Sequence, residues 1–189
     1  MARDVRRLSR GATDPGGGLR MLPREGAREA FTAFFAAEYP RMVRTVYLVV
    51  HDHGRAEEIA QDAFVQLLDH WETVSGYEQP AAWVRRVAIR MAVRAGNRER
   101  RRSLLERRSR TEPDEVSQPD GTSDAVLAAV RTLPTNQRAA IVLHYFEDRP
   151  VAEIADVLGC APATARVHLY KARRHLAELL HEEVDDVAG

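Results

Sequence analysis

The sequence predicts an all-α protein built from two small helical domains, which are joined by a flexible acidic linker; the second domain contains a helix-turn-helix. Three observations support this prediction. Apolar residues recur at helical spacing through two long blocks, and no stretch of any length alternates with the period of a strand. Between the blocks, residues 109–123 combine two prolines with an Asp-Gly pair and no large apolar cluster, which is typical of a linker. The expected domains are therefore 27–108 and 124–182.

The N-terminal residues 1–26 are rich in arginine and glycine and poor in large apolar side chains. Such a segment cannot bury enough surface to offset its ordering entropy, so we expect it to be a disordered tail. Residues 183–189 are expected to form a second, short tail. An N-terminal tail of this composition could touch DNA or a membrane, but an idle tail is the simpler interpretation.

Three helices are expected in the first block. The first begins near Ala27, and Pro40 should kink or break it. The second covers about Arg55–Trp71, with apolar residues on one side and an acidic patch on the other. The third begins near Pro80 and continues into an arginine-rich end.

In the second block, a helix is expected from Pro134 to about Phe146. The next one carries an apolar face at 3.6-residue spacing from Val151 to Leu158. Gly159 follows, where the left-handed turn of a helix-turn-helix is needed, and Pro162 suits the first position of the last helix. That helix presents long cationic side chains, as a helix in a DNA major groove requires. The alternative is a helical bundle with a solvated basic face.

Charge is segregated along the chain although the formal net charge is zero, with 28 Lys and Arg against 28 Asp and Glu. Residues 94–110 hold eight arginines and two glutamates, whereas residues 111–124 hold five acids and no Lys or Arg. This pattern predicts a basic face beside an acidic linker, and it excludes a uniformly basic protein.

Several classes of chemistry lack a sequence signal. The single cysteine, Cys160, excludes an internal disulfide and is interpreted as a small buried hydrophobe. His51 and His53 are too few for a metal site, and there is no phosphate-binding loop or nucleophile–base pair. We therefore expect neither a metal, nor a cofactor, nor catalysis. Without an apolar run of membrane length or a secretory signal, a cytoplasmic protein without membrane insertion is expected.

Three stretches together resemble the extracytoplasmic-function (ECF, group IV) branch of the sigma-70 superfamily of bacterial RNA polymerase sigma factors. AEEIAQDAFVQLLDHW at 56–71 resembles the family's polymerase-binding helix. PAAWVRRVAIRMA at 80–92 resembles the segment that opens and reads the −10 promoter element. LPTNQRAAIVLHYFED with VAEIADVLGCAPATARVHLYKAR resembles the domain that reads the −35 element. The resemblance covers roughly 28–108 and 124–181.

The resemblance implies an alternative sigma factor that binds core RNA polymerase and promoter DNA and is held by an anti-sigma factor. It implies three sets of contact residues. The set for core polymerase is Glu57, Glu58, Gln61 and Asp62. The set for the −10 element is Tyr77, Trp83, Arg85, Arg86 and Arg90. Of the two aromatic residues, Tyr77 is the better candidate to contact a flipped base, and Trp83 is better explained as a residue of the hydrophobic core. The set for the −35 element is Thr164, Arg166, His168, Lys171, Arg173 and Arg174.

The sequence differs from the usual pattern of the family at three places. Arg90 and Arg94 stand where the family usually carries Asn and then Asp. Pro150 and Ala161 replace the serines that commonly cap the two helices of the helix-turn-helix; Asp148 is the expected substitute for the first cap. Val167 and His168 stand where a Ser and an Arg are usual. Promoter preference therefore does not transfer from the family.

Two other functions remain open on the sequence alone. One is a helix-turn-helix regulator that works without polymerase, and the other is a helical enzyme acting on nucleic acid. The acidic patch at 57–62 distinguishes a sigma factor from the first alternative, because a sigma factor needs the patch to bind polymerase and a simple repressor does not. The second lacks any paired acid, ligand set or nucleophile.

Overall fold

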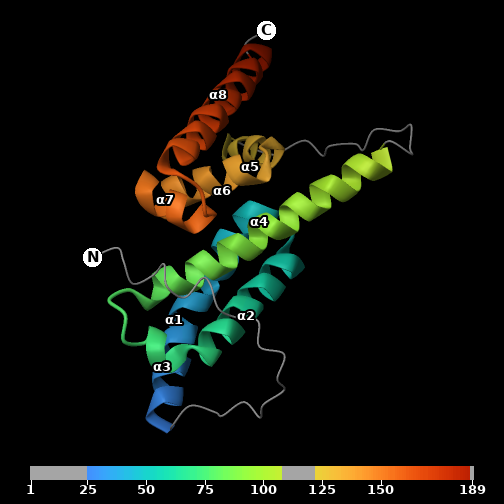
Figure 1. Ribbon diagram of the computed structural model, residues 1–189. Helices are drawn as coiled ribbons and strands as arrows, with labels where there is room; N and C mark the ends of the chain where they lie inside the picture. Colours follow the sequence, from blue (N-terminus) through green and yellow to red (C-terminus); the bar gives the residue numbers. More distant parts are fainter. Residues whose placement is uncertain (1–24, 108–121, 188–189) are drawn as a thin grey trace.

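The computed structural model describes residues 25–107 and 122–187, and in these ranges it contains helices and no strand (Figure 1). The all-α prediction is confirmed. The first block consists of α1 (Glu25–Val50), α2 (His53–Asp69), α3 (Trp71–Val74) and α4 (Pro80–Arg107). The second consists of α5 (Thr122–Thr132), α6 (Thr135–Ile141), the π-helical turn η2 (Val142–Phe146), α7 (Val151–Leu158) and α8 (Pro162–Val187).

The first block is a bundle in which α1, α2 and α4 pack against one another. Aromatic side chains of α1 pack around Phe64 of α2 and Trp71 of α3, with ring centroids about 5 to 6 Å apart. Asp52 caps α2, since its carboxylate accepts a hydrogen bond of 2.8 Å from the backbone N–H of Arg55. The expected break at Pro40 is wrong: α1 runs through it without interruption.

The second block contains the predicted helix-turn-helix, α7 and α8. Gly159 between them adopts φ 69° and ψ 36°, the left-handed conformation that glycine reaches without a Cβ penalty. Pro150 precedes α7 without a side-chain cap, so Asp148 does not replace the missing serine. Asp148 itself has a positive φ of 50°, in the loop that leads into α7.

The predicted helix ending at Phe146 is present, but its last turn is wider than expected. After α6 the chain forms η2, in which the backbone N–H of Glu147 donates to the carbonyl of Val142, five residues earlier. A π-helical turn adds one residue to the ladder and therefore changes the direction of the side chains that follow. Glu147 leaves this turn toward the first block.

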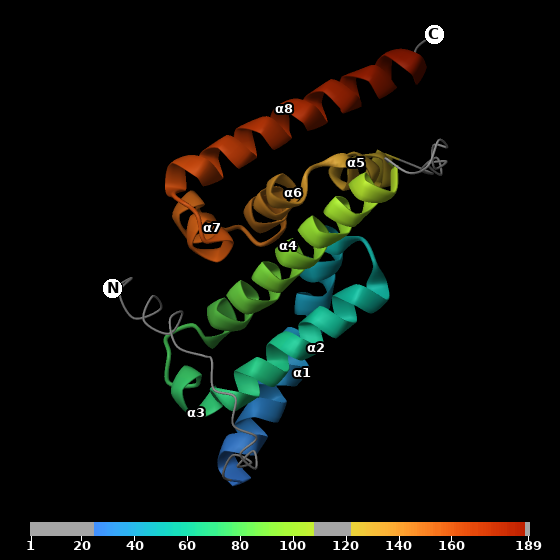
Figure 2. The same ribbon diagram turned by 45° about the vertical axis from the view of Figure 1, so that its right-hand side comes forward.

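The two blocks, which the sequence predicts as separate domains on a flexible linker, pack against each other. Helix α4 lies between them (Figures 1 and 2) and contacts α1 and α2 as well as α6 and α7. One connected set of buried apolar residues joins Val49 and Ile89 of the first block to Leu143 and Ile154 of the second. The blocks behave as two halves of one folded unit.

The predicted boundaries shift at their ends. The expected N-terminal tail overlaps α1, which begins at Glu25, and the expected C-terminal tail overlaps α8, which continues to Val187. The predicted linker ends at 123, but α5 already begins at Thr122. The remainder of both tails and of the linker, residues 1–24, 108–121 and 188–189, lies outside the described residues.

Candidate functional site

The predicted polymerase-binding residues form an exposed ridge on α2. Glu57, Glu58, Gln61 and Asp62 are all exposed, and their spacing places them on one face of the helix. The opposite face of α2 is buried in the bundle. Glu58 accepts a hydrogen bond of 2.7 Å from Arg55, and the side-chain amide of Gln61 lies 3.4 Å from the hydroxyl of Tyr39. The ridge is therefore an acidic and polar surface held by the bundle behind it.

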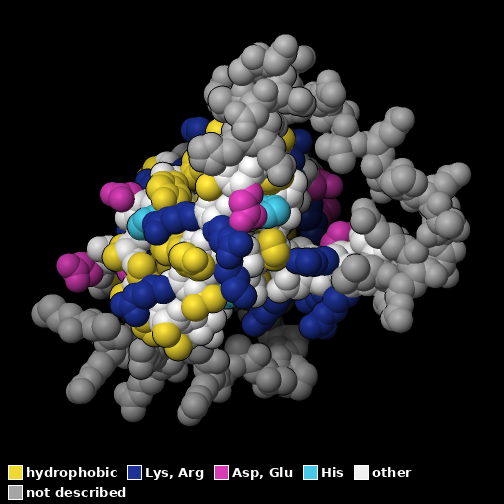
Figure 3. All heavy atoms as spheres, turned by 90° about the horizontal axis from the view of Figure 1, so that it is seen from above, with side chains coloured by type: hydrophobic (Ala, Val, Ile, Leu, Met, Phe, Trp, Pro, Cys, Tyr) yellow, Lys and Arg dark blue, Asp and Glu magenta, His cyan; other side chains and the backbone are white. Residues whose placement is uncertain are grey.

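The last helix carries the second predicted set. Five of its six members are exposed, and His168 is half-buried. Burial, followed by the positive charge of Lys171, lowers the pKa of His168, so it is a neutral hydrogen-bonding group at neutral pH. The view from above, onto the end of the molecule that carries α8, shows Lys and Arg side chains beside hydrophobic ones (Figure 3). The exposed members are Thr164, Arg166, Lys171, Arg173 and Arg174.

An aromatic residue that the sequence analysis did not single out positions one of these cations. Tyr145 of η2 is 59% exposed, and its hydroxyl accepts a hydrogen bond of 2.9 Å from Nε of Arg173. The guanidinium carbon also lies 5.6 Å from the centre of the tyrosine ring. Val167 and Tyr170, also large and exposed, complete the apolar part of this surface. Their only sequence signal is an apolar residue on an otherwise polar helix face.

In the third predicted set, the two aromatic residues are half-buried. Tyr77 lies in the loop before α4, and both it and Trp83 pack against the apolar core. The ring of Trp83 lies 5.5 Å from that of His70. Arg86, on the first turns of α4, is half-buried as well. Tyr77 precedes α4, and Trp83 and Arg86 lie in its first two turns.

Arg85 and Arg90 are the other two members of that set. Both contact the second block, although a DNA-binding role predicts that they face solvent. Arg85 is buried, and its Nε donates to Glu147 at 3.1 Å. Arg90 donates from Nε and Nη2 to the backbone carbonyls of Val157 and Asp156, at 3.0 and 2.9 Å. Burial lowers the pKa of both arginines, though each stays charged at neutral pH. In this arrangement both guanidinium groups hold the second block.

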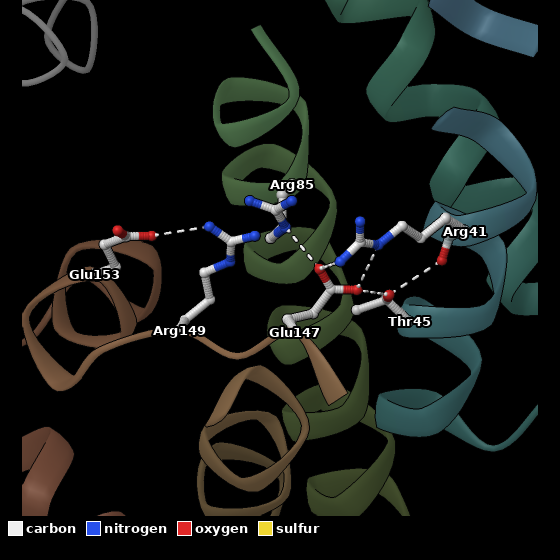
Figure 4. Close-up of polar contacts among 6 residues, drawn as sticks. All are labelled: Arg41, Thr45, Arg85, Glu147, Arg149 and Glu153. Atoms are coloured by element: carbon white, nitrogen blue, oxygen red, sulfur yellow. Dashed lines mark hydrogen bonds and ion pairs between the residues drawn. The ribbon is translucent and has the colours of Figure 1, made fainter. Parts of the chain in front are cut away.

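Glu147 is the centre of this contact between the blocks (Figure 4). Its carboxylate is 4% exposed and receives Arg41 of α1 at 3.0 Å, Arg85 of α4 at 3.1 Å and the hydroxyl of Thr45. Arg149 follows two residues later and lies 3.5 Å from Glu153. An ionised carboxylate loses hydration when it is buried, and these charged donors compensate for that loss. No sequence pattern indicated Glu147, because its partners are 62 to 106 residues away.

A third contact runs in the opposite direction across the interface. Arg138 of α6 donates from Nη1 to the carbonyl of Val49, at the end of α1, with a distance of 2.7 Å. The hydroxyl of Tyr47 accepts a hydrogen bond of 3.2 Å from Arg131 of α5. Burial lowers the pKa of Arg138 to about 10, which still leaves it cationic at neutral pH. Arginine side chains from both blocks thus join the interface.

The comparisons with known proteins match both blocks. The family profile "Sigma-70 region 2" covers residues 34–102, and "Sigma-70, region 4" covers residues 123–176. The chain is similar to the RNA polymerase sigma factor CarQ of Myxococcus xanthus, with 26% identity over 87% of this chain and 97% of CarQ. It is 29% identical to the ECF RNA polymerase sigma factor SigK of Mycolicibacterium vanbaalenii, covering 86% of this chain and 87% of SigK.

The chain belongs to the sigma-70 family, in its ECF branch. It is an alternative sigma factor, which directs promoter-specific transcription initiation. The first block is region 2 and the second is region 4, and both names are used below. A solved structure, the sigma factor RpoE in complex with the anti-sigma factor NepR from Bartonella quintana, has the same fold. Its TM-score is 0.63 at 20% identity, over 81% of this chain and 98% of that one.

The described parts of region 2 and region 4 contain no group of three or more His, Cys, Asp or Glu that could hold a metal ion. None of the helices in residues 25–107 and 122–187 is long and apolar enough to cross a membrane. Cys160, expected to be buried, is half-buried beside the turn glycine, and burial raises the pKa of its thiol.

His51 gives the interface a dependence on pH. It follows α1 with a positive φ of 58°, and burial, together with Arg138 and Arg131, lowers its pKa to about 3. In the unfolded chain His51 is protonated near its ordinary pKa of 6.5, whereas in the folded chain it is protonated only near pH 3. The stability that depends on neutral His51 is therefore fully present above pH 6.5 and is lost as the pH falls toward 3.

We predict that His51→Asn makes the free energy of unfolding fall less steeply between about pH 7 and about pH 5 than it does in the wild type. Asparagine tolerates the left-handed backbone at this position, so the fold is kept. Urea unfolding followed by circular dichroism at several pH values measures the slope. His53→Asn, two residues away and exposed, is the control for loss of an imidazole. Equal slopes for His51→Asn and the wild type would contradict the prediction.

Proposed function

We propose that this sigma factor docks on core RNA polymerase through the exposed ridge on α2, made of Glu57, Glu58, Gln61 and Asp62. The observation that carries this proposal is that all four residues are exposed while the opposite face of α2 is buried in the bundle. A row of carboxylates facing basic groups on a partner gives orientation and partner choice more than affinity. A regulator that works without polymerase has no use for such a surface.

Region 4 is proposed to bind duplex DNA at the −35 element through α8. Its exposed cations follow the Gly159 turn, which sets the angle between α7 and α8. Thr164, Arg166 and His168 lie in the early turns and are proposed to meet base edges or phosphates. Lys171, Arg173 and Arg174 lie further along, where contacts to phosphates are expected. Tyr145 would hold Arg173 in place for such a contact.

Region 2 is proposed to capture the unpaired −10 strand at the beginning of α4. Half-buried Tyr77 and Trp83 provide aromatic faces beside the cations of the helix, as in other surfaces that bind single strands. Arg86 is proposed to contact phosphates. Arg85 and Arg90 belong to the same proposed surface once region 4 has left them.

An anti-sigma factor is proposed as a further partner, and the cytoplasm, where transcription takes place, as the site of action. The support for this partner is the fold shared with RpoE, whose structure was solved in complex with the anti-sigma factor NepR. An inhibitor of this kind would have to cover the α2 ridge, the α8 face, or both. A pull-down from the source cells that recovers polymerase and no other stoichiometric protein would count against it.

We predict that the double variant Glu58→Arg, Asp62→Arg loses co-elution with sigma-free core polymerase, with roughly 100-fold weaker binding. The reason is that like charges placed across an interface cost several kcal/mol. Size-exclusion chromatography and a fluorescence titration measure the binding.

The matched control is Glu25→Arg, Glu29→Arg, which reverses two exposed acids with the same four-residue spacing on α1. The control should bind core polymerase as the wild type does. If the wild type fails to co-elute but still binds duplex DNA, the chain acts without polymerase and the proposed docking is wrong.

We predict that Lys171→Ala reduces the slope of log affinity for duplex DNA against log salt concentration by roughly 0.9, because one phosphate contact and its released counterions are lost. Fluorescence anisotropy at several salt concentrations gives the slope. Arg28→Ala removes an exposed cation from α1 and should leave the slope unchanged. If both variants change the slope equally, the binding is not centred on α8.

A further inference from the structure

We propose that region 4 is an internal competitor of promoter DNA, and that Glu147 occupies on region 2 the place of a DNA phosphate. The closed arrangement then holds the sigma factor in a state that cannot take the −10 strand. This inference rests on the proposed role of α4 in binding that strand. The regulatory contact lies within the chain, between the described parts of regions 2 and 4.

The chemistry of the contact supports the competition. Glu147 presents an anion to two guanidinium groups: Arg41 reaches it from Nε and Nη2, at 3.4 and 3.0 Å, and Arg85 from Nε at 3.1 Å. Arginine binds carboxylate and phosphate with the same fork of N–H donors. A phosphate of the DNA backbone and the carboxylate of Glu147 therefore compete for the same donors.

The contact also withdraws a second cation from DNA. Arg90 lies five residues after Arg85 on α4 and is bonded to the carbonyls of Asp156 and Val157. These carbonyls lie in the last turn of α7, where a helix leaves its C=O groups without partners. Region 4 thus binds Arg85 through an acid and Arg90 through a helix end. Three arginines of region 2 contact region 4 in this way, Arg41 of α1 and Arg85 and Arg90 of α4, and the two on α4 belong to the proposed −10 surface.

The residues of α4 that face region 4 allow the two regions to pack closely. Ile89 and Ala92 are fully buried between Arg85 and Gly96, at helical spacing. A Cβ atom at Gly96 would lie 2.7 Å from Cγ2 of Thr135 in α6, which is closer than real Cβ contacts. Glycine weakens a helix interior relative to alanine, so its presence in α4 is explained by the close approach of α6.

The closed state can still open. Arg41 remains half-exposed at the edge of the cluster, with 53% of its side chain accessible, so a competing anion reaches the contact from solvent. Buried ion pairs contribute more to the choice of geometry than to stability, because desolvation offsets much of their attraction. Because the cations of α8 are exposed while Arg85 is buried, duplex DNA can bind region 4 before region 2 is released.

The first test removes the competing anion. In Glu147→Gln the free full-length chain should bind a fluorescent 30-nucleotide single strand of mixed sequence about tenfold more tightly, as expected if roughly a tenth of the wild type is open. Glu153→Gln, which removes the same charge from a nearby exposed position, should bind as the wild type does. Equal affinity of Glu147→Gln and the wild type, including no binding by either, would overturn the proposal.

The second test locks the interface. A Cβ at Gly96 would lie 3.5 Å from Cβ of Thr135, within the roughly 3.5–4.5 Å that a disulfide requires. We would make Gly96→Cys, Thr135→Cys in a Cys160→Ser background and compare the oxidised and reduced forms of the same protein. Oxidation should weaken binding of the single strand by at least about tenfold and leave binding of a duplex to α8 unchanged. Equal binding of the single strand by both forms would overturn the proposal.

Failure of this inference is distinct from failure of the proposed function. Co-elution with core polymerase, measured on the reduced protein, reports on the α2 ridge and does not involve Glu147. If co-elution fails while Glu147→Gln and the lock change single-strand binding as predicted, the competition stands and the polymerase docking is wrong. If co-elution succeeds and neither variant changes single-strand binding, the docking stands and the competition is wrong.

Discussion

The arrangement of the two regions depends on one buried carboxylate. Glu147 leaves the wide turn η2 and enters a space bounded by α1 and α4, where it is almost completely buried. Arg41, Arg85 and Thr45 donate hydrogen bonds to it and replace the lost hydration. Removing one partner of such a pair costs about 3–5 kcal/mol, since the remaining charge is then buried alone. Region 4 therefore docks on region 2 in one orientation, the one that satisfies Glu147.

Each region also completes a helix end of the other. Arg90 of region 2 donates to the last carbonyls of α7, and Arg138 of region 4 donates to the carbonyl of Val49 at the end of α1. The C-terminal ends of helices carry partial negative charge, so a cation is favourable at both places. These contacts are polar and specific, and the apolar core that runs through both regions supplies the rest of the packing. Arg90 also belongs to the proposed −10 surface, which links the closed state to DNA binding.

The helices could be predicted from the sequence, but the interface between regions 2 and 4 could not. Periodicity placed the helix-turn-helix from Val151 onward, and Gly159 marked its turn, because local conformation fixes both. The α2 ridge could be predicted for the same reason, since residues four apart share a helix face. The partners of Glu147 could not, because contacts across more than 60 residues leave no local pattern. The wide turn at Val142–Phe146 and the unbroken helix at Pro40 are set by tertiary packing, which overrides local preference.

In the closed state, Glu147 holds the two regions of the free sigma factor together. The most direct measurement is the distribution of distances between spin labels at two exposed positions, Thr73 of α3 and Ala177 of α8, in a Cys160→Ser background. We expect one narrow distribution for the free chain, and a broad or second distribution in Glu147→Lys or when core polymerase and DNA are added. A broad distribution in the free chain, unchanged by Glu147→Lys, would contradict it.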